Sequence, residues 1–311
     1  MKLIRGGTFL MGSNAHYEEE RPTRQVAVAD FWMDATPVTN AQFAQFVAAT
    51  GYVSFAELPP NPADYPGILP QMARPGSLVF MPEVNTVDLS GEPTWWHFVF
   101  DACWKRPLGS GSDIDGLLDH PVVHITPADA QAYASWAGKA LPSEAEWEFA
   151  ARGGLYGKAY AWGDELEPGG VPMANIWQGE FPYVNTASRA LKRTTPVRSY
   201  SANGYGLYDM IGNVWEWTAD GEDMAASPAP KCCSKRSLSH APASVTVGVG
   251  TQVQIPRRIA KGGSHLCAPN YCERYRPAAR WAQPIDTSTS HMGLRCIIRC
   301  GDMGPDNGVE G

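Results

Sequence analysis

Apolar residues recur at helical spacing in three segments of the chain, and each segment follows a residue that can cap a helix. In a capping box, a Ser or Thr and an acidic or amide residue three positions later satisfy each other's backbone N–H groups. The pairs with this spacing are Thr39 with Gln42, Thr126 with Asp129, and Ser143 with Glu146. Pro127 also suits a first helical position, where its missing N–H costs nothing. The pattern therefore predicts three helices.

The same spacing predicts which residues these helices bury and where they end. The predicted inward-facing residues are Phe43, Phe46, Val47, Tyr133, Trp136, Ala137, Trp147 and Ala150. Glycine readily adopts the left-handed conformation that ends a helix. The expected ends are Gly51, Gly138 and Gly153–Gly154.

Elsewhere the chain shows short alternating runs such as Val26–Val28 and Arg295–Ile298, which predict strands. Strands and helices do not alternate, so a doubly wound parallel sheet is excluded. The 311 residues include 31 Gly and 26 Pro, a high share that indicates ordered loops. Eleven Trp and twelve Tyr still provide large side chains for a core. The expected fold class is α+β, loop-rich and low in regular secondary structure.

The chain has no internal repeat, and a single domain is expected over residues 1–300. Residues 223–256 are rich in Ala, Ser, Pro and Val, which predicts a surface excursion containing the adjacent Cys232 and Cys233. Such a pair can be a redox or metal site, although general loop behaviour favours a structural or incidental role. Residues 301–311 have the composition of a flexible tail.

Charge and apolar runs exclude two classes of partner. The net charge is −7 and no basic cluster is long enough to follow a phosphate backbone, so we expect no nucleic-acid partner. The N-terminus lacks the apolar run of a signal peptide, and no stretch approaches the roughly 20 apolar residues needed to span a bilayer. Seven cysteines, an odd number, indicate a reducing compartment. A cytoplasmic protein that does not engage membranes is expected.

The most informative segment of the chain contains Cys267 and Cys272. Two thiolates in one short turn can converge on Cu(I), which prefers soft ligands. A disulfide, half of a zinc site or two buried thiols would fit this spacing as well. Gly262 and Gly263 allow a close backbone approach or positive φ, as a narrow slot over a metal or an ordinary turn requires. Ser264 lies three residues before the first thiol, within reach of such a site.

Other polar and aromatic residues adjoin the cysteines. Tyr271 precedes Cys272 and can supply an O–H to the site or pack as a core aromatic. Arg274 and Arg276 would share one face of a strand. Together with Arg280 they can hold active-site loops or a peptide through carboxylate or backbone contacts, but ordinary ion pairs are favoured for at least two of the three.

Six blocks of sequence, in order, resemble the formylglycine-generating enzymes of the sulfatase-modifying factor family. The blocks are GGTFLMGS (Gly6–Ser13), FWMDATPVTNAQFAQFV (Phe31–Val47), DHPVVHITPADAQAYASWAGKALPSEAEWEFAARGG (Asp119–Gly154), ANIWQGEFP (Ala174–Pro182), NGYGLYDMIGNVWEWT (Asn203–Thr218) and the segment from KGGSHLC to RYRPAAR (Lys261–Arg280). The resemblance covers nearly the whole chain and implies that family's C-type-lectin-like fold. Most blocks recur across the wider superfamily, whereas Cys267 and Cys272 in the Gly-Gly-Ser setting indicate its copper-dependent, prokaryotic type.

The resemblance implies an O2-consuming, monooxygenase-like oxidoreductase. In the implied reaction, Cys267 and Cys272 hold Cu(I), and a sulfatase polypeptide presents the Cys of a Cys-X-Pro-X-Arg motif as a third ligand. Oxidation at Cβ gives a thioaldehyde, which hydrolyses to Cα-formylglycine. Ser264, Tyr271 and Trp215 are implied to surround the oxygen. A thiol reductant completes the stoichiometry, and no organic cofactor is implied.

The resemblance also implies structural Ca²⁺. One site would use Asp209, Gly212, Val214 and Glu216, which combine carboxylates with backbone carbonyls, the hard ligands that Ca²⁺ prefers. A second site would use Asn175 and Ile176 with an acidic residue further on. That position holds Arg189 here, and Leu191 stands two residues later. A cation in place of a carboxylate argues against the second site.

Two alternatives remain from other classes of protein. A non-catalytic, lectin-like binding paralogue would have no reason to keep Cys267, Cys272 and Ser264 together. An iron-dependent sulfoxide synthase relative would need clustered histidines, and the seven here are scattered without metal-binding spacing. They are His16, His97, His120, His124, His240, His265 and His291.

The resemblance finally bears on the remaining cysteines. Secreted relatives carry disulfide cysteines at the positions of Ala134, Ala151 and Pro277. Their absence leaves Cys296 without a partner and agrees with a reducing compartment.

Overall fold

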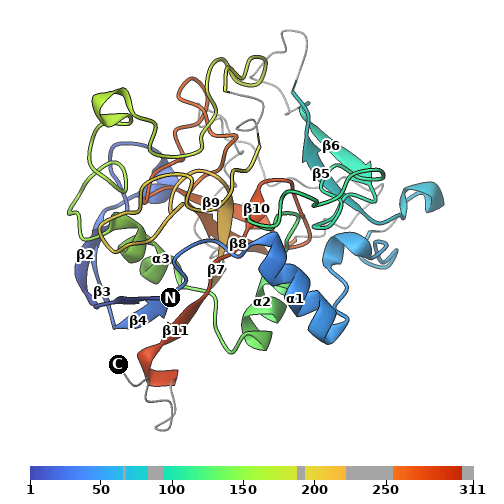
Figure 1. The fold of residues 1–311 in the computed structure, drawn as a ribbon, viewed down its shortest axis with the longest axis horizontal. Coiled ribbons are helices and arrows are strands. Elements are labelled where there is room, and N and C mark those ends of the chain that lie inside the picture. Colours follow the sequence, from blue (N-terminus) through green and yellow to red (C-terminus); the bar gives the residue numbers. More distant parts are fainter. Residues whose placement is uncertain (66–67, 83–93, 188–192, 222–254, 303–311) are drawn as a thin grey trace, which may run out of the picture.

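The computed structural model describes residues 1–65, 68–82, 94–187, 193–221 and 255–302 (Figure 1). The predicted excursion at 223–256, with Cys232 and Cys233, lies outside these residues except for its last two positions. The predicted tail lies outside them after residue 302.

A four-stranded sheet in the order β10-β7-β8-β9 occupies the centre of the molecule (Figure 1). Its strands are β7 (Trp215–Gly221), β8 (Arg257–Lys261), β9 (Arg280–Pro284) and β10 (Met292–Gly293). β8 pairs antiparallel with β7 and β9, and β10 runs parallel to β7. Glu216 pairs with Lys261, so Trp215 lies beside the point where the chain leaves β8. The predicted thiol segment connects β8 to β9 and therefore starts next to Trp215.

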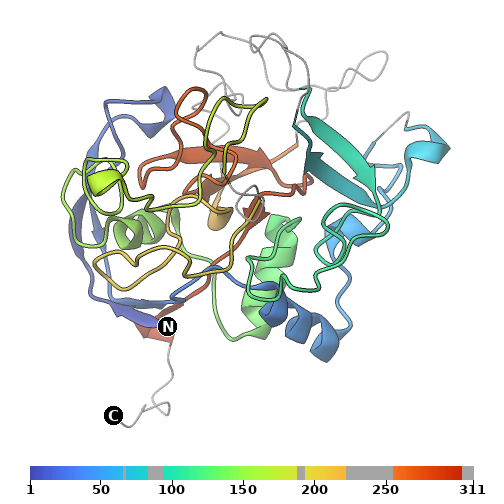
Figure 2. The same ribbon diagram turned by 45° about the horizontal axis from the view of Figure 1, so that its top comes forward.

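Smaller sheets surround the centre and bring the ends of the fold together. The order β1-β4-β11 joins β1 (Lys2–Ile4), β4 (Phe31–Met33) and β11 (Ile297–Arg299). Two hairpins pair β2 (Gly7–Met11) with β3 (Arg24–Val28), and β5 (Gly76–Phe80) with β6 (Trp96–Phe100). The first hairpin lies beside α3 and the second on the opposite side of the molecule (Figure 2).

The strand predictions hold in part. Val26–Val28 lies within β3, as predicted. The prediction for Arg295–Ile298 starts two residues too early, because β11 begins at Ile297. Arg295 is fully buried and its guanidinium binds Glu216, so the residue serves an ion pair instead of the strand.

The three predicted helices are present with their capping boxes. They are α1 (Asn40–Thr50), α2 (Pro127–Trp136) and α3 (Glu144–Arg152). Gly51, Gly138 and Gly153 follow them with positive φ, as predicted. Short 3₁₀ helices span Glu18–Glu20, Phe55–Glu57, Pro70–Met72, Pro168–Gly170 and Cys300–Asp302. One inward-facing prediction is wrong: Trp136, the last residue of α2, is 42% exposed, although its ring contacts those of Phe46 and Tyr133.

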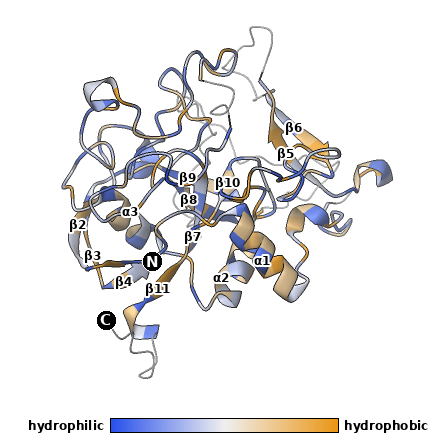
Figure 3. Cartoon of the chain, viewed as in Figure 1, coloured by the Kyte–Doolittle hydropathy of each residue, from blue (hydrophilic) through white to orange (hydrophobic). Residues whose placement is uncertain are grey.

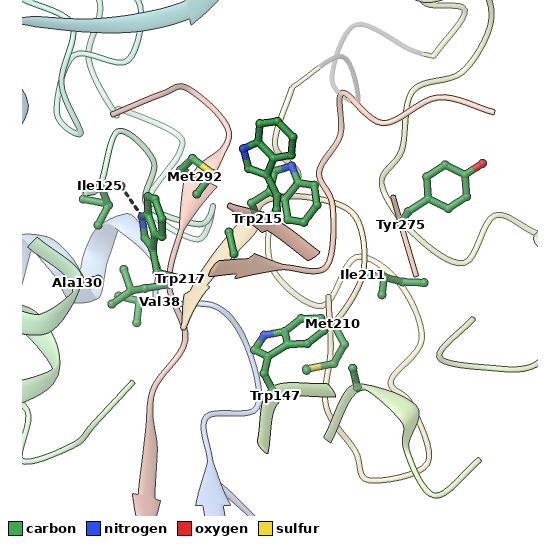
Figure 4. Packing of buried hydrophobic residues seen from close by; sticks show 14 of the residues in the cluster. Val38, Ile125, Ala130, Trp147, Met210, Ile211, Trp215, Trp217, Tyr275 and Met292 are labelled. Atoms are coloured by element: carbon green, nitrogen blue, oxygen red, sulfur yellow. Dashed lines mark hydrogen bonds between the residues drawn. The ribbon is translucent and has the colours of Figure 1, made fainter. Parts of the chain in front are cut away.

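Large aromatic residues fill the space between the central sheet and the helices (Figure 4). Trp147 of α3 and Trp215 and Trp217 of β7 are completely buried. Trp217 also donates its indole N–H to the Ile125 carbonyl at 2.7 Å, which ties β7 to the segment before α2. Hydrophobic residues extend outward along α1 and the β5–β6 hairpin (Figure 3). The expected loop-rich α+β fold is confirmed.

Candidate active site

The segment from Gly262 to Ala279, here called the thiol loop, connects β8 to β9 and carries both predicted thiols. Two successive turns shape it: Cys267 N–H donates to the Ser264 carbonyl, and Cys272 N–H donates to the Ala268 carbonyl, both at 3.0 Å. Trp177 N–H donates to the Cys267 carbonyl and anchors the loop from outside. Cys267 and Cys272 are 2% and 0% exposed, so both thiols lie within the protein.

Tyr17 packs against the thiol loop, which itself contains Tyr275. The Arg274 guanidinium lies 3.9 Å from the centre of the Tyr17 ring. Burial raises the pKa of both phenols. Tyr17 comes from the N-terminal segment and was not predicted from sequence.

The glycines before Ser264 make the close approach that was predicted. Gly262 and Gly263 have φ of +96° and +72°. A Cβ on Gly263 would lie 2.6 Å from the Arg274 carbonyl oxygen, and one on Gly262 would lie 2.9 Å from the Met210 carbonyl oxygen. A side chain at either position would separate the start of the thiol loop from the backbone that packs against it.

Ser264 and Tyr271 both lie inside the loop, in different surroundings. Ser264 is fully buried, and its hydroxyl accepts the Leu266 N–H at 3.2 Å. Tyr271 stacks on Phe181, with ring centroids 4.7 Å apart, and meets Trp95 edge to face at 5.5 Å. Tyr271, which the resemblance places near the oxygen, is therefore also a packed aromatic residue. Trp95 and Phe181 were missed, although Phe181 belongs to one of the six sequence blocks.

Trp215 carries an unusual polar group. Its side chain is completely buried, and its indole Nε1 has no hydrogen-bond partner among the described residues. Buried donors in native proteins are nearly always paired, so an orphan of this kind calls for an explanation. The indole projects from β7 near Met292 (Figure 4). Its N–H is therefore a hydrogen-bond donor with capacity left for a bound species.

The arginines after Cys272 form ion pairs, which is the role that the sequence favoured for at least two of the three. Arg276 binds Glu20 through two contacts of 2.7 and 2.5 Å, and Arg280 binds Glu144 at 2.8 and 3.0 Å. Arg274 contacts Glu19 at 2.5 Å. Arg274 and Arg276 do not lie in a strand, because β9 begins only at Arg280, so the shared strand face considered for them does not arise.

The physical reason is that each guanidinium reaches a different carboxylate. Glu19 and Glu20 belong to the 3₁₀ helix Glu18–Glu20, so the loop bends to meet them instead of extending. The acidic run Glu18–Glu20 was the available sequence signal. Fixed pairs of this bidentate kind restrain the loop that holds Cys272.

Lys261 fixes the other end of the thiol loop. It is fully buried, and its ammonium lies 3.0 Å from Glu148 and 3.4 Å from Glu144, both in α3. Glu148 also binds Arg152 at 2.6 Å. A buried cation with two carboxylates is compensated, whereas removing one partner would leave an uncompensated charge. The thiol loop is thus held at both ends by ion pairs.

The residues predicted to bind Ca²⁺ lie close together but already have partners. Glu216 binds Arg295 at 3.0 Å and accepts the Trp147 indole N–H at 2.7 Å. The Asp209 carboxylate accepts the Arg198 N–H at 2.9 Å, and burial, followed by the nearby charge of Glu216, raises the pKa of Asp209. Asp209 therefore has acceptor capacity left, while that of Glu216 is largely used.

The remaining predicted calcium residues lie in adjoining loops. A Cβ on Gly212 would lie 2.6 Å from the Asn175 carbonyl oxygen, so the loops that contain Asn175, Ile176, Gly212 and Val214 are in contact. Arg189 and Leu191 lie outside the described residues. Within the described ranges, no group of three or more His, Cys, Asp or Glu side chains is placed to hold a metal ion.

Buried histidines take structural roles here. His124 donates to the Pro107 carbonyl at 3.0 Å, and His265 donates to the Asn213 carbonyl at 2.8 Å. Burial lowers the pKa of each to about 4, so both are neutral near pH 7. Cys296 is a fully buried free thiol, as predicted.

Comparison with known proteins bears directly on this arrangement. Residues 1–300 match the family described as "Sulfatase-modifying factor enzyme 1-like domain". The chain is 50% identical over 295 residues to "Formylglycine-generating enzyme" of Mycobacterium tuberculosis, covering 94% of this chain and 95% of that protein. The chain belongs to the formylglycine-generating enzyme family.

Membership in this family does not by itself decide activity. The chain is also 41% identical over 307 residues to mouse "Inactive C-alpha-formylglycine-generating enzyme 2", covering 95% of this chain and 84% of that protein. Among solved structures, PvdO from Pseudomonas aeruginosa aligns with a TM-score of 0.55 at 20% identity, over 96% of this chain and 93% of that one. That similarity shows the fold alone. In the part of the chain that the structure describes, no helix combines the length and apolar character needed to cross a membrane.

Proposed function

We propose that this protein is a copper-dependent oxidase that converts the Cys of a Cys-X-Pro-X-Arg sulfatase motif into Cα-formylglycine. The observation that carries the proposal is the pair Cys267 and Cys272, buried together in a loop fixed at both ends. Molecular oxygen is the acceptor and a thiol supplies electrons: R–CH₂–SH + O₂ + 2 e⁻ + 2 H⁺ gives R–CHO + H₂S + H₂O. Unpaired buried thiols such as Cys103 and Cys296 support a reducing, cytoplasmic setting.

The residues present fit Cu(I). Cys267 and Cys272 supply soft sulfur ligands, and a pair of thiolates suits a low-coordinate soft ion better than Zn²⁺, which needs four ligands. The buried, unpartnered Trp215 N–H supplies a donor without a present acceptor. When bound, Cu(I) would supply one-electron chemistry toward O₂ and would favour the deprotonated substrate thiol.

The chain's own groups then have distinct tasks. Cys267 and Cys272 hold the ion, and their burial excludes bulk water from the reacting atoms. The Trp215 N–H lies ready to stabilise an oxygen atom that gains negative charge, as a preorganised donor does. Ser264 and Tyr271 carry the O–H groups available to move a proton. Burial lowers the pKa of the nearby His265 to about 4, so its imidazole is a weak base, and coordination of the substrate thiol to the metal would remove the need for a stronger one.

We further propose one structural Ca²⁺ site built on Asp209, with the backbone carbonyls of Gly212 and Val214. Glu216 would join only by sharing its carboxylate with Arg295. The site at Asn175 and Ile176 is the weaker proposal, since Asn175 already donates to the Arg193 carbonyl at 2.8 Å and no carboxylate adjoins it in the part of the chain described here.

The assay that tests the function is incubation of the protein with Cu(I), a thiol reductant and a Cys-X-Pro-X-Arg peptide in air. We expect an aldehyde at the former Cys position, trapped with a hydrazide and located by mass spectrometry. A Ser-X-Pro-X-Arg peptide is the matched control. Unchanged Cys peptide from a copper-loaded, folded sample would instead indicate the non-catalytic alternative.

A further inference from the structure

A second feature adjoins the thiol loop at His265. It is a cavity of about 560 Å³, within the size range of ligand-binding clefts. Its wall is largely apolar and includes Phe80, Leu108 and Trp177. About half of the lining residues are polar, among them His265 and Arg193. A cleft that combines apolar surface with polar side chains has the composition of a recognition site.

Direct contacts connect this cavity to the proposed active site. His265 belongs to the thiol loop and follows Ser264 in sequence. Trp177 donates its backbone N–H to the Cys267 carbonyl at 3.0 Å. Phe80 contacts Phe181, with centroids 5.6 Å apart, and Phe181 in turn stacks on Tyr271. Two aromatic rings therefore separate the cavity from Tyr271.

The charge at the cavity wall is unbalanced at Arg193. Among the described residues no carboxylate forms an ion pair with its guanidinium, and its side chain is exposed. Asp113 also lines the cavity, but it accepts the Asp115 N–H at 2.9 Å and forms no ion pair with Arg193. A guanidinium without an ion-pair partner can bind a ligand carboxylate through two parallel hydrogen bonds.

From these observations we infer that the cavity binds a segment of the substrate polypeptide next to the modified motif, one that carries an apolar residue and a neighbouring acidic residue. The inference rests on the proposed function, because a polypeptide that delivers its Cys to Cys267 and Cys272 must continue along the surface on both sides of the thiol loop. The apolar wall accepts the apolar side chain, and Arg193 accepts the carboxylate. The motif then brings the substrate to the thiols, and the cavity selects among polypeptides that share it.

The test uses three fluorescent peptides in which Ser replaces the reactive Cys, so that binding is measured without turnover. One carries only the Ser-X-Pro-X-Arg motif, and two carry the same motif extended by Leu and Glu on the amino or the carboxyl side. Fluorescence anisotropy should show that the parent protein binds one extended peptide about 10- to 100-fold more tightly than the motif alone, the range for filling an apolar pocket.

Substitutions in the cavity wall test whether the tighter binding of the extended peptide depends on the cavity. Leu108→Glu and Arg193→Gln should each remove most of the advantage of the extended peptide and leave the Kd of the motif-only peptide unchanged. Leu118→Glu is the matched control, because Leu118 is 50% exposed, Leu108 is 44% exposed, and only Leu108 lines the cavity. Leu108 and Arg193 both have exposed side chains, so the fold should tolerate the two cavity substitutions.

The outcomes separate this inference from the proposed function. Equal affinity for all three peptides, or an advantage that survives in both cavity variants, overturns the inference even if Cys peptides are converted to aldehyde. A cavity-dependent advantage in a protein that converts no Cys peptide would support substrate binding and contradict the oxidase.

Discussion

At the scale of single residues, the site separates groups that bind metal from groups that act on the substrate. Cys267 and Cys272 are the only site residues with soft donor atoms. Ser264 accepts a backbone N–H within the loop and Tyr271 stacks on Phe181, so each is held in place by contacts that do not involve the thiols. Removing either hydroxyl should therefore leave the thiol pair intact.

This separation predicts the behaviour of Ser264→Ala and Tyr271→Phe. Both variants should keep Cu(I) and bind substrate peptide, while kcat falls about 10- to 1,000-fold, the range for losing one transition-state hydrogen bond or proton donor. Copper content, melting temperature and kcat are measured on the same samples. Loss of activity in step with loss of stability would show that the two residues only pack, and an unchanged kcat would remove them from the mechanism.

At the scale of elements, β7 and the loop before it connect the proposed calcium residues to the active site. Glu216 and Trp215 are neighbours in β7, and Glu216 faces Lys261, whose ion pairs fix the start of the thiol loop. Asp209 has φ of +55°, in the left-handed region that Asp occupies more readily than most residues. A cation bound at Asp209 would therefore act on the loop that leads directly into β7.

The calcium proposal predicts an effect on stability rather than on copper binding. An ion that binds only the folded state contributes about 2.7 kcal/mol when it is present at about 100 times its Kd. Chelation should lower the melting temperature of the parent protein and leave its Cu(I) affinity unchanged. Asp209→Ala should melt at the lower temperature with or without calcium. If this variant keeps both the calcium content and the melting temperature of the parent, the site does not exist.

At the scale of the whole molecule, local signals predicted the elements well and long-range contacts poorly. Capping boxes act over three residues, so all three helices were found. Trp136 was misplaced because its burial depends on what covers the end of α2, which no local pattern records. The ion-pair partners of Arg274 and Arg276 could not be named in advance, because Glu19 and Glu20 lie some 250 residues away in sequence.

The candidate site shows the same limit. Cys267, Cys272 and Ser264 are close in sequence, so one motif identified them together. Tyr17, Trp95 and Phe181 come from three distant segments, and single aromatic residues give no sign of which site they will join. The orphan Trp215 N–H is likewise visible only once its surroundings are known.

The central claim is that Cys267 and Cys272 together hold the metal that performs the chemistry. The most direct test is Cu(I) titration with a competing chelator, on the parent, Cys267→Ser and Cys272→Ser, with melting temperature recorded for each. Cys296→Ser serves as the control for a buried thiol outside the site. We predict one tightly bound Cu(I) per chain in the parent and in Cys296→Ser, and none in the other two variants at unchanged fold. Equal copper binding by all four proteins would contradict the account.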